Sequence, residues 1–450
     1  MIHISFGLDE HVRSVLAVGG LCLLLLSGCD AATPSGEADR GQAVPGLSAP
    51  READRGLATR SMTAFRSVSA ADPELVDEKP DQAARLAEPL WTFGLDLLSR
   101  QAAKTRGNIV VSPVSLHAVL SMMLDGAGAG TAAEMRRVLG VETLSAEDRR
   151  AAWAGLIRRA NHTDRAEVRV ALSLWTRSGL APRPEFATAQ ASAFAADSYP
   201  LAEDPTEAAA AINGWIAERT GDRITDLLST VSPDTMLLLV NTVYAKVGWW
   251  HFRADQTESA PFTLADGSTV EVAMMHGRTW GEVTVTEAYD AMPLDTDGRL
   301  TLWLVVPKGD ASPESLIPVL AWEGRAALSR DPQSADVEVF LPRFHIEHRA
   351  DGLMDDLGQM GMPAAFIPGQ ADFGGVSASE PLFISEVLQK AMIEVNERGI
   401  EAAAATSVSA EAGGPPERKL SFRADRPFLA VLSQDNCNAP LFVMLVRDPR

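Results

Sequence analysis

Few of the residue types that perform catalysis occur in this sequence at spacings that would let them act together. Ser112 and His117 could form a nucleophile and a base, but Ser112 precedes a proline and favours a helix start, with His117 an ordinary helix residue. His345 and His348 lie three residues apart in an alternating segment, so in a strand they point to opposite faces and cannot bind one ion together. Gly-x-Ser-x-Gly, His-Glu-x-x-His and Cys-x-x-Cys motifs do not occur. We therefore expect no metal and no cofactor, and an enzyme is the minor hypothesis.

A glycine-rich segment, Gly126-Ala127-Gly128-Ala129-Gly130, invites comparison with a phosphate-binding loop. It lacks the Gly-Lys-Ser/Thr ending and follows no clear buried strand. Thr131 with Glu134 is typical of a capping box, so we predict a turn before a capped helix.

The segment from Val395 to Pro416 has a composition that fits two different structures. The four alanines Ala402 to Ala405 favour a helix, but the Ser, Val, Gly and Pro residues after them cannot sustain one. One interpretation is a surface loop with a helical turn. The other is a segment whose small side chains let it enter a β-sheet as an added strand. Composition alone leaves both open.

The start of this segment resembles the hinge of a serpin reactive loop. The hinge residues are Glu397, Arg398, Gly399, Ile400, Glu401, Ala402, Ala403, Ala404, Ala405 and Thr406. Other segments that resemble serpin motifs are Asn108 to Leu116, Asn241 to Trp250, Leu341-Pro342-Arg343-Phe344, and Ala424 to Leu429, which resembles the strand immediately after the loop. The resemblance covers residues 83–450. Serpins are protease inhibitors that act by inserting the reactive loop into their main sheet.

The resemblance implies an α+β fold with three β-sheets, about eight or nine helices and an exposed reactive loop near the C-terminus. Hydrophobic patterns predict several of its elements independently. Met236 to Val240 and Leu300 to Pro307 are continuous apolar runs, typical of strands covered on both faces. Val168 to Leu174 and Val337 to Glu347 alternate as half-buried strands do, and Ala208 to Leu228 has helical spacing.

In the mechanism that the resemblance implies, a protease cleaves the exposed loop and the freed segment inserts as a central strand, which distorts the attached enzyme. About a dozen new backbone hydrogen bonds at about 1 kcal/mol each would release on the order of 10 kcal/mol. Because side chains alternate along a strand, one set of hinge residues faces the core and the other faces outward. The core set is Ile400, Ala402, Ala404 and Thr406; the outward set is Glu401, Ala403 and Ala405.

Four more residues have roles that the resemblance implies. Ser112, Asn241 and Gln389 would form a hydrogen-bonded shutter beneath the main sheet, and Trp249 would lie where the loop first enters. Gln389 replaces the histidine of the family pattern but keeps a donor and an acceptor. Ile400 replaces the usual Thr or Ser, which leaves open an alternative, a non-inhibitory serpin acting as a binding module or chaperone.

The scissile bond is predicted by counting along the loop. Counting from Glu397 gives Gly413–Gly414, with Ala412–Gly413 next, whereas counting back from Pro427 gives a bond about three residues later. The small residues Ala412, Gly413 and Gly414 suit an elastase-like or subtilisin-like serine protease, with cysteine proteases as the second class of target.

The N-terminus predicts export and anchoring. Residues 1–28 resemble a bacterial lipoprotein signal peptide ending in Leu26-Ser27-Gly28, which would leave Cys29 acylated. Residues 29–82 have the composition of a disordered linker, spanning roughly 40 Å, before the serpin domain at 83–450. We expect a lipid-anchored protein facing the periplasm or the cell surface.

Charge and cysteine content limit the partners further. A net charge of −20 argues against nucleic acid and anionic membrane surfaces as partners. Once Cys22 leaves with the signal and Cys29 carries lipid, Cys437 has no partner for an intramolecular disulfide. The expected partners are a target protease and, through the anchor, a membrane; we expect a monomer.

Overall fold

A five-stranded β-sheet forms the centre of the fold. The computed structural model describes residues 82–161, 166–296, 298–378, 381–399 and 418–450. The sheet has the strand order β10-β11-β4-β2-β3. Its strands are β2 (Ala166–Thr176), β3 (Asp197–Pro200), β4 (Leu237–Val247), β10 (Phe344–Arg349) and β11 (Glu386–Val395). The continuous apolar run at the start of β4 thus marks a central strand, as its pattern predicts.

The second sheet has nine strands, and one long strand joins its two parts. Its order is β1-β14-β13-β8-β7-β6-β9-β12, with β5 also paired to β6. The strands are β1 (Ile109–Val111), β5 (Glu258–Thr263), β6 (Thr269–Val285), β7 (Tyr289–Asp295), β8 (Leu300–Pro307), β9 (Gln333–Pro342), β12 (Lys419–Arg423), β13 (Phe428–Gln434) and β14 (Pro440–Val446). Because β6 pairs with β7 at one end and with β5 and β9 along the rest, it connects the second and third of the predicted sheets.

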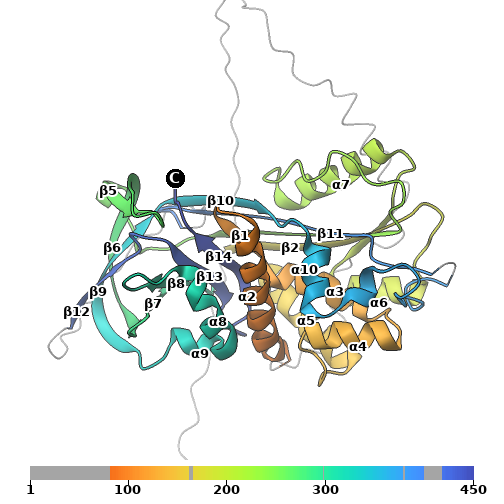
Figure 1. Cartoon of the computed structure of the whole chain (residues 1–450), viewed down its shortest axis with the longest axis horizontal. Helices are drawn as coiled ribbons and strands as arrows, with labels where there is room; N and C mark the ends of the chain where they lie inside the picture. Colours follow the sequence, from red (N-terminus) through yellow and green to blue (C-terminus); the bar gives the residue numbers. More distant parts are fainter. Residues whose placement is uncertain (1–81, 162–165, 297, 379–380, 400–417) are drawn as a thin grey trace, which may run out of the picture. The chain divides into compact units, whose positions relative to one another are not determined.

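Helices cover both faces of the five-stranded sheet (Figure 1). The helices of the described residues are α2 (Ala87–Lys104), α3 (Pro113–Leu124), α4 (Ala129–Val138), α5 (Ala146–Asn161), α6 (Pro184–Phe194), α7 (Pro205–Thr220), α8 (Pro313–Glu323), α9 (Arg325–Leu328) and α10 (Leu353–Met360), with short 3-10 turns η1 (Ala83–Leu86), η2 (Ala254–Gln256) and η3 (Pro363–Phe366). Figure 1 shows α7 on one side of the sheet and α3 to α6 on the other. The α+β prediction is confirmed.

The start of α3 shows how sequence produces this packing. Ser112 caps the helix by accepting a hydrogen bond from the Ser115 backbone N–H, and Pro113 occupies the first turn, where its missing N–H is not needed. Every residue of α3 is buried, in keeping with a helix that is apolar almost all round. Position 112 is therefore fixed directly beneath the five-stranded sheet.

Three local predictions were wrong. The segment Ala424 to Leu429 is not the strand after the loop, because β12 begins at Lys419 and the chain then turns before β13. The predicted helix to Leu228 ends at Thr220, since Gly221 takes a left-handed conformation with φ of 61°. The expected capping box does not form: Gly128 is the N-cap of α4, and the Thr131 hydroxyl accepts from the backbone of Asp372 instead.

Two observations bear on membrane and metal binding. Within the described residues, no helix is long and apolar enough to cross a membrane. The same residues contain no cluster of three His, Cys, Asp or Glu side chains that could hold a metal ion. Cys437, the one described cysteine, is a buried free thiol.

Candidate functional site

Three of the sequence-predicted residues meet where β4 lies beside β11. The Gln389 amide nitrogen donates to the Ser112 carbonyl oxygen at 2.9 Å and to Asn241 Oδ1 at 2.9 Å. The Gln389 side-chain oxygen accepts from the Ser112 backbone N–H at 3.1 Å. Asn241 in turn donates to the Leu388 carbonyl at 2.9 Å. The cluster thus cross-links α3, β4 and β11.

A fourth residue, Ser115, completes this cluster, which we call the shutter cluster (Ser112, Ser115, Asn241 and Gln389). The Ser115 hydroxyl donates to Asn241 Oδ1 at 2.8 Å and lies 3.0 Å from the Gln389 amide nitrogen. All four residues are at most 1% exposed. Buried amides are costly unless paired, and here the glutamine uses both its donor and its acceptor. Gln389 therefore makes the hydrogen bonds of this cluster at a position where the family pattern has histidine.

Two residues beyond Gln389 and Asn241, toward the C-terminal ends of the strands, β4 and β11 stop pairing. Their parallel register runs from Glu386 opposite Leu238 to Ala391 opposite Val243. Each strand continues for four residues beyond the last pair, β4 to Val247 and β11 to Val395, without pairing to the other. The junction is therefore closed at one end and unpaired at the other.

A tight turn follows the unpaired end of β11. Asn396 and Gly399 exchange two backbone hydrogen bonds of 3.0 and 2.9 Å as an antiparallel bridge, so the chain reverses direction there. Gly399 has φ of 96°, a value that L side chains rarely adopt. The buried Trp249 side chain donates from Nε1 to the Asn396 carbonyl at 2.9 Å. Trp249 thus holds the turn against the end of β4.

Glu397 secures the same turn to the second sheet. Its carboxylate accepts from Arg343 Nε at 2.8 Å and from the Thr257 hydroxyl, and its side chain is only 8% exposed. Burial alone would raise the pKa of Glu397, but the hydrogen bonds from Arg343 and Thr257 outweigh it, so this pKa lies below its usual value. Arg343 lies between β9 and β10, where the chain passes from one sheet to the other.

On the α7 side of the sheet, Lys390 ties β11 to its surroundings. Its ammonium group is 2.5 Å from a Glu347 carboxylate oxygen and 3.0 Å from Asp226, in the segment after α7. Burial alone would lower the pKa of Lys390. The hydrogen bonds and charges of Glu347 and Asp226 raise it by more, so this pKa lies above its usual value. The lysine is therefore a charged link at the last part of β11 that pairs with β4.

The structure describes part of the predicted site. Glu397, Arg398 and Gly399 lie in the turn, whereas Ile400 to Thr406, the scissile candidates Ala412, Gly413 and Gly414, and Cys29 lie outside the described residues. Sequence reasoning did not assign roles to Ser115, Arg343 or Thr257. Ser115 follows the helix cap by three residues, a position whose N–H commonly bonds to the cap, but nothing local marks Thr257.

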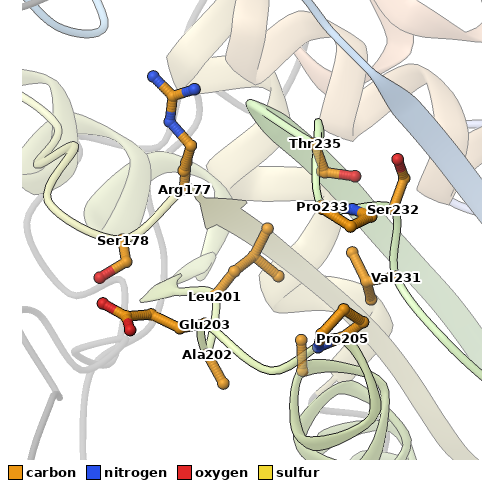
Figure 2. A pocket seen from close by; sticks show the side chains of 11 residues that line it. Arg177, Ser178, Leu201, Ala202, Glu203, Pro205, Val231, Ser232, Pro233 and Thr235 are labelled. Carbon is orange, nitrogen blue, oxygen red and sulfur yellow. The ribbon is translucent and has the colours of Figure 1, made fainter.

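A pocket of about 280 Å³ lies at the opposite end of β4 from Trp249. Figure 2 shows Ser178 and Glu203 on one side of it and Ser232 and Thr235 on the other. Leu201 and the first residue of α7, Pro205, also line it. Its single acid and scattered hydroxyls form no metal-ligand set, and it contains none of the predicted site residues.

The fold and this site define a class of protein. The family profile described as "Serpin (serine protease inhibitor)" matches residues 90–449. The chain belongs to the serpin family. An uncharacterized serpin-like protein of Thermococcus kodakarensis is 32% identical over 385 residues, covering 83% of this chain and 88% of the relative.

Other similar proteins include an elastase inhibitor and a thyroxine-binding protein. Leukocyte elastase inhibitor A of Mus musculus is 31% identical over 384 residues, covering 79% of this chain and 97% of that protein. Among solved structures, the thermophilic serpin tengpin in its native state matches with a TM-score of 0.74 at 24% identity, covering 86% of this chain and 98% of tengpin. Human thyroxine-binding globulin matches with a TM-score of 0.74 at 25% identity, covering 82% of this chain and 99% of that one. Serpins are generally protease inhibitors, but some bind other ligands.

Proposed function

We propose that this serpin inhibits a serine protease as a suicide substrate, with residues 400–417 as the reactive loop. The protease cleaves the loop through an acyl-enzyme, and the loop then inserts between β4 and β11 before the enzyme can deacylate. The observation that carries this proposal is the pairing of β4 with β11, which stops at Ala391 and Val243, beside the turn that begins the loop. An entry point for an added strand is thus already present.

The turn at Asn396 and Gly399 supplies the register for insertion. Extending its antiparallel bridge past Gly399 would place each loop residue opposite a residue of β11, and directly opposite residues share a face of the sheet. The β11 partners of the core set are all at most 1% exposed, so bulky loop side chains would strain the packing there. The pairs are Ile400 with Val395, Ala402 with Ile393, Ala404 with Ala391, and Thr406 with Gln389. The alanine run supports insertion in this register.

The target class follows from the predicted cleavage positions. Ala412, Gly413 and Gly414 offer no large side chain, which favours an elastase-like or subtilisin-like protease over a trypsin-like one. The similarity to leukocyte elastase inhibitor A supports the same class. Cysteine proteases are the second class to test.

The test is incubation of the full chain with pancreatic elastase, subtilisin and trypsin, followed by denaturing electrophoresis. We expect an adduct that survives SDS with elastase or subtilisin, and mass spectrometry of the released C-terminal peptide should place the cut among residues 412–414. Protease blocked at its active-site serine is the control and should give no adduct.

The outcome that contradicts inhibition is cleavage without an adduct. If the nicked protein also melts at the same temperature as the intact one, the loop has not inserted. Ile400 at the start of the core set would then explain slow insertion, and a non-inhibitory binding module or chaperone becomes the better assignment.

We further propose that the protein is an exported bacterial lipoprotein, monomeric and held to a membrane by acylated Cys29. The apolar run before Cys29 and the polar linker composition of residues 29–82 support this. Expression with a labelled fatty acid should label the wild type and not Cys29→Ala, which should also leave the membrane fraction. Equal labelling of both would contradict the anchor.

A further inference from the structure

One tryptophan stands out on the solvent face of β6. Trp280 is 63% exposed, although the residues two positions either side of it, Arg278 and Glu282, are the charged residues expected on such a face. Val283, which points the other way, is buried. Trp280 lies in the part of β6 that pairs with β9, and its exposed indole has no packing reason, because it contributes nothing to the core.

The neighbours of Trp280 on this face are already paired with one another. Arg278 forms a bidentate ion pair with Asp336 on β9. Phe340 lies between His276, stacked at 4.6 Å between ring centroids, and the Arg423 guanidinium at 4.0 Å. Among the described residues, the Trp280 ring takes part in no ring stack, cation–π pair or side-chain hydrogen bond. Its apolar surface is therefore the free part of an otherwise satisfied polar face.

Trp280 lies close to the point where the reactive loop rejoins the second sheet. It is directly opposite Asp336 on β9, and Asp336 is opposite Lys419, the first residue of β12. Arg418 is the first described residue after the loop, and its carbonyl accepts a hydrogen bond from the Asp336 backbone N–H at 2.9 Å. Two strand spacings separate Trp280 from Lys419, which is about 10 Å.

The length of the remaining loop limits where a bound protease can lie. From Gly413 to Lys419 there are six residues, at most about 20 Å of extended chain. A protease domain of about 200 residues has a radius of gyration of about 16 Å and is thus about 40 Å across. The diameter of such an enzyme exceeds the length of chain between Gly413 and this face. An enzyme whose active site holds the loop at Gly413 can therefore reach Trp280.

We propose that the outer face of β6, β9 and β12 around Trp280 is a second contact for the protease that holds the reactive loop. This inference rests on the proposed function. The protease would cover the indole with an apolar or cationic side chain beside its substrate cleft, and Arg278, Glu282 and Lys419 would form the polar rim. A central tryptophan within a polar rim is the arrangement in which single residues contribute most to binding. The contact speeds capture and leaves the insertion step unchanged.

The kinetic test compares Trp280→Ala with a matched control, Trp322→Ala. Trp322 is 89% exposed on α8, which packs on α2 and β8 outside this face. With whichever of elastase or subtilisin forms the adduct, Trp280→Ala should lower the second-order rate constant of inhibition about tenfold, and Trp280→Phe should restore part of it. Trp322→Ala should inhibit at the wild-type rate. Equal melting temperatures would show that all variants are folded.

Direct proximity is measured by placing benzoylphenylalanine at position 280 or 322 and irradiating a complex with protease whose catalytic serine is alanine. Cross-linking from 280 alone supports the proposal. Normal adduct formation with equal rates for both alanine variants, and no cross-link from 280, would overturn the second contact and leave the inhibitor assignment standing. If no protease forms an adduct with any variant, the proposed function fails and this contact fails with it.

Discussion

The two halves of the junction between β4 and β11 are held in different ways. The paired half has strand hydrogen bonds from Glu386 to Ala391, and the buried, uncharged shutter cluster lies beneath it. The unpaired half is secured at its end by Trp249, by the turn at Asn396 and by Glu397 with Arg343, whose side chain is 47% exposed. Breaking the first leaves buried amides without partners, whereas in the second water can reach the half-exposed Arg343 side chain and replace its ion pair.

In the proposed mechanism, this difference would give insertion a direction. A strand that entered at the unpaired end would meet the contacts of Trp249 and Glu397 first and the shutter cluster afterwards. Under the proposed function, the protein could remain closed before cleavage and still offer a starting point for the new strand. The predictions below test the two halves separately.

The largest effect is expected from a charge in the core set of the hinge. Ala404→Arg would have to bury a guanidinium opposite Ala391, which costs several kcal/mol without a partner. Protease should then cleave the loop without being trapped, and the number of inhibitor molecules consumed per enzyme should rise at least about tenfold in a titration. Ala403→Arg, on the outward set, is the control; a similar loss of inhibition in both variants would contradict the predicted register.

The shutter cluster should matter most for stability. Gln389→Ala removes four buried side-chain hydrogen bonds, to Ser112, Ser115 and Asn241, and should lower the free energy of unfolding by about 2–4 kcal/mol. For a domain of this size the melting temperature should fall by about 3–5 °C. Gln389→His, which keeps a donor and an acceptor, should recover most of the loss. An unchanged melting temperature for Gln389→Ala would mean that water replaces the amide.

At the unpaired half, loss of the Glu397 contacts should change local opening more than global stability. Glu397→Gln should cost at most about 1 kcal/mol, because Arg343 is half exposed. Backbone amides of Met392 to Val395 should nevertheless exchange with deuterium several-fold faster, measured by mass spectrometry. Arg398→Ala, at the adjacent exposed position of the turn, is the control and should exchange at the wild-type rate.

The smallest effect is the pH dependence of the same contact. The pKa of Glu397 is lower in the folded protein than in the unfolded chain, so its stabilisation is present above the unfolded pKa of about 4.3 and is lost as the pH falls through the folded value. Wild-type protein should lose this part of its stability below about pH 4. Glu397→Gln should lack this component, so the difference in melting temperature between the two proteins should shrink on acidification. A constant difference from pH 7 to pH 3 would contradict the assignment.

Much of the fold could be predicted where a segment has the same surroundings along its whole length, because its residue types then follow one pattern. The continuous apolar run Leu300–Pro307 matches β8 at both ends, because a strand covered on both faces has no polar position. The end of α7 was missed because Ile224 and Leu227 continue its apolar spacing and pack in the same cluster after the helix has ended. Asp425 and Pro427 give Ala424 to Leu429 the character of a turn, which the resemblance to a strand outweighed.

The site was less accessible to sequence reasoning. Ser112 and Gln389 bond to one another across 277 residues, and only the family resemblance brought them together beforehand. Arg343 lies within a recognised motif, yet its partnership with Glu397 depends on the chain passing between two sheets at that residue. Contacts made by tertiary arrangement leave no periodic signal in the residues that make them.

The ten residues of β11 also set a distance. In the proposed reaction the first ten loop residues, 400–409, would lie alongside β11, so an enzyme attached at Gly413 would be carried past the whole strand, which is about 33 Å long. Its destination is the end of β4 that borders the pocket of Figure 2, far from where it first bound. The length of the strand thus sets how far the enzyme would move. Shortening or lengthening the loop by two residues would shift the final position of the enzyme by about 7 Å, without changing which side chains face the core.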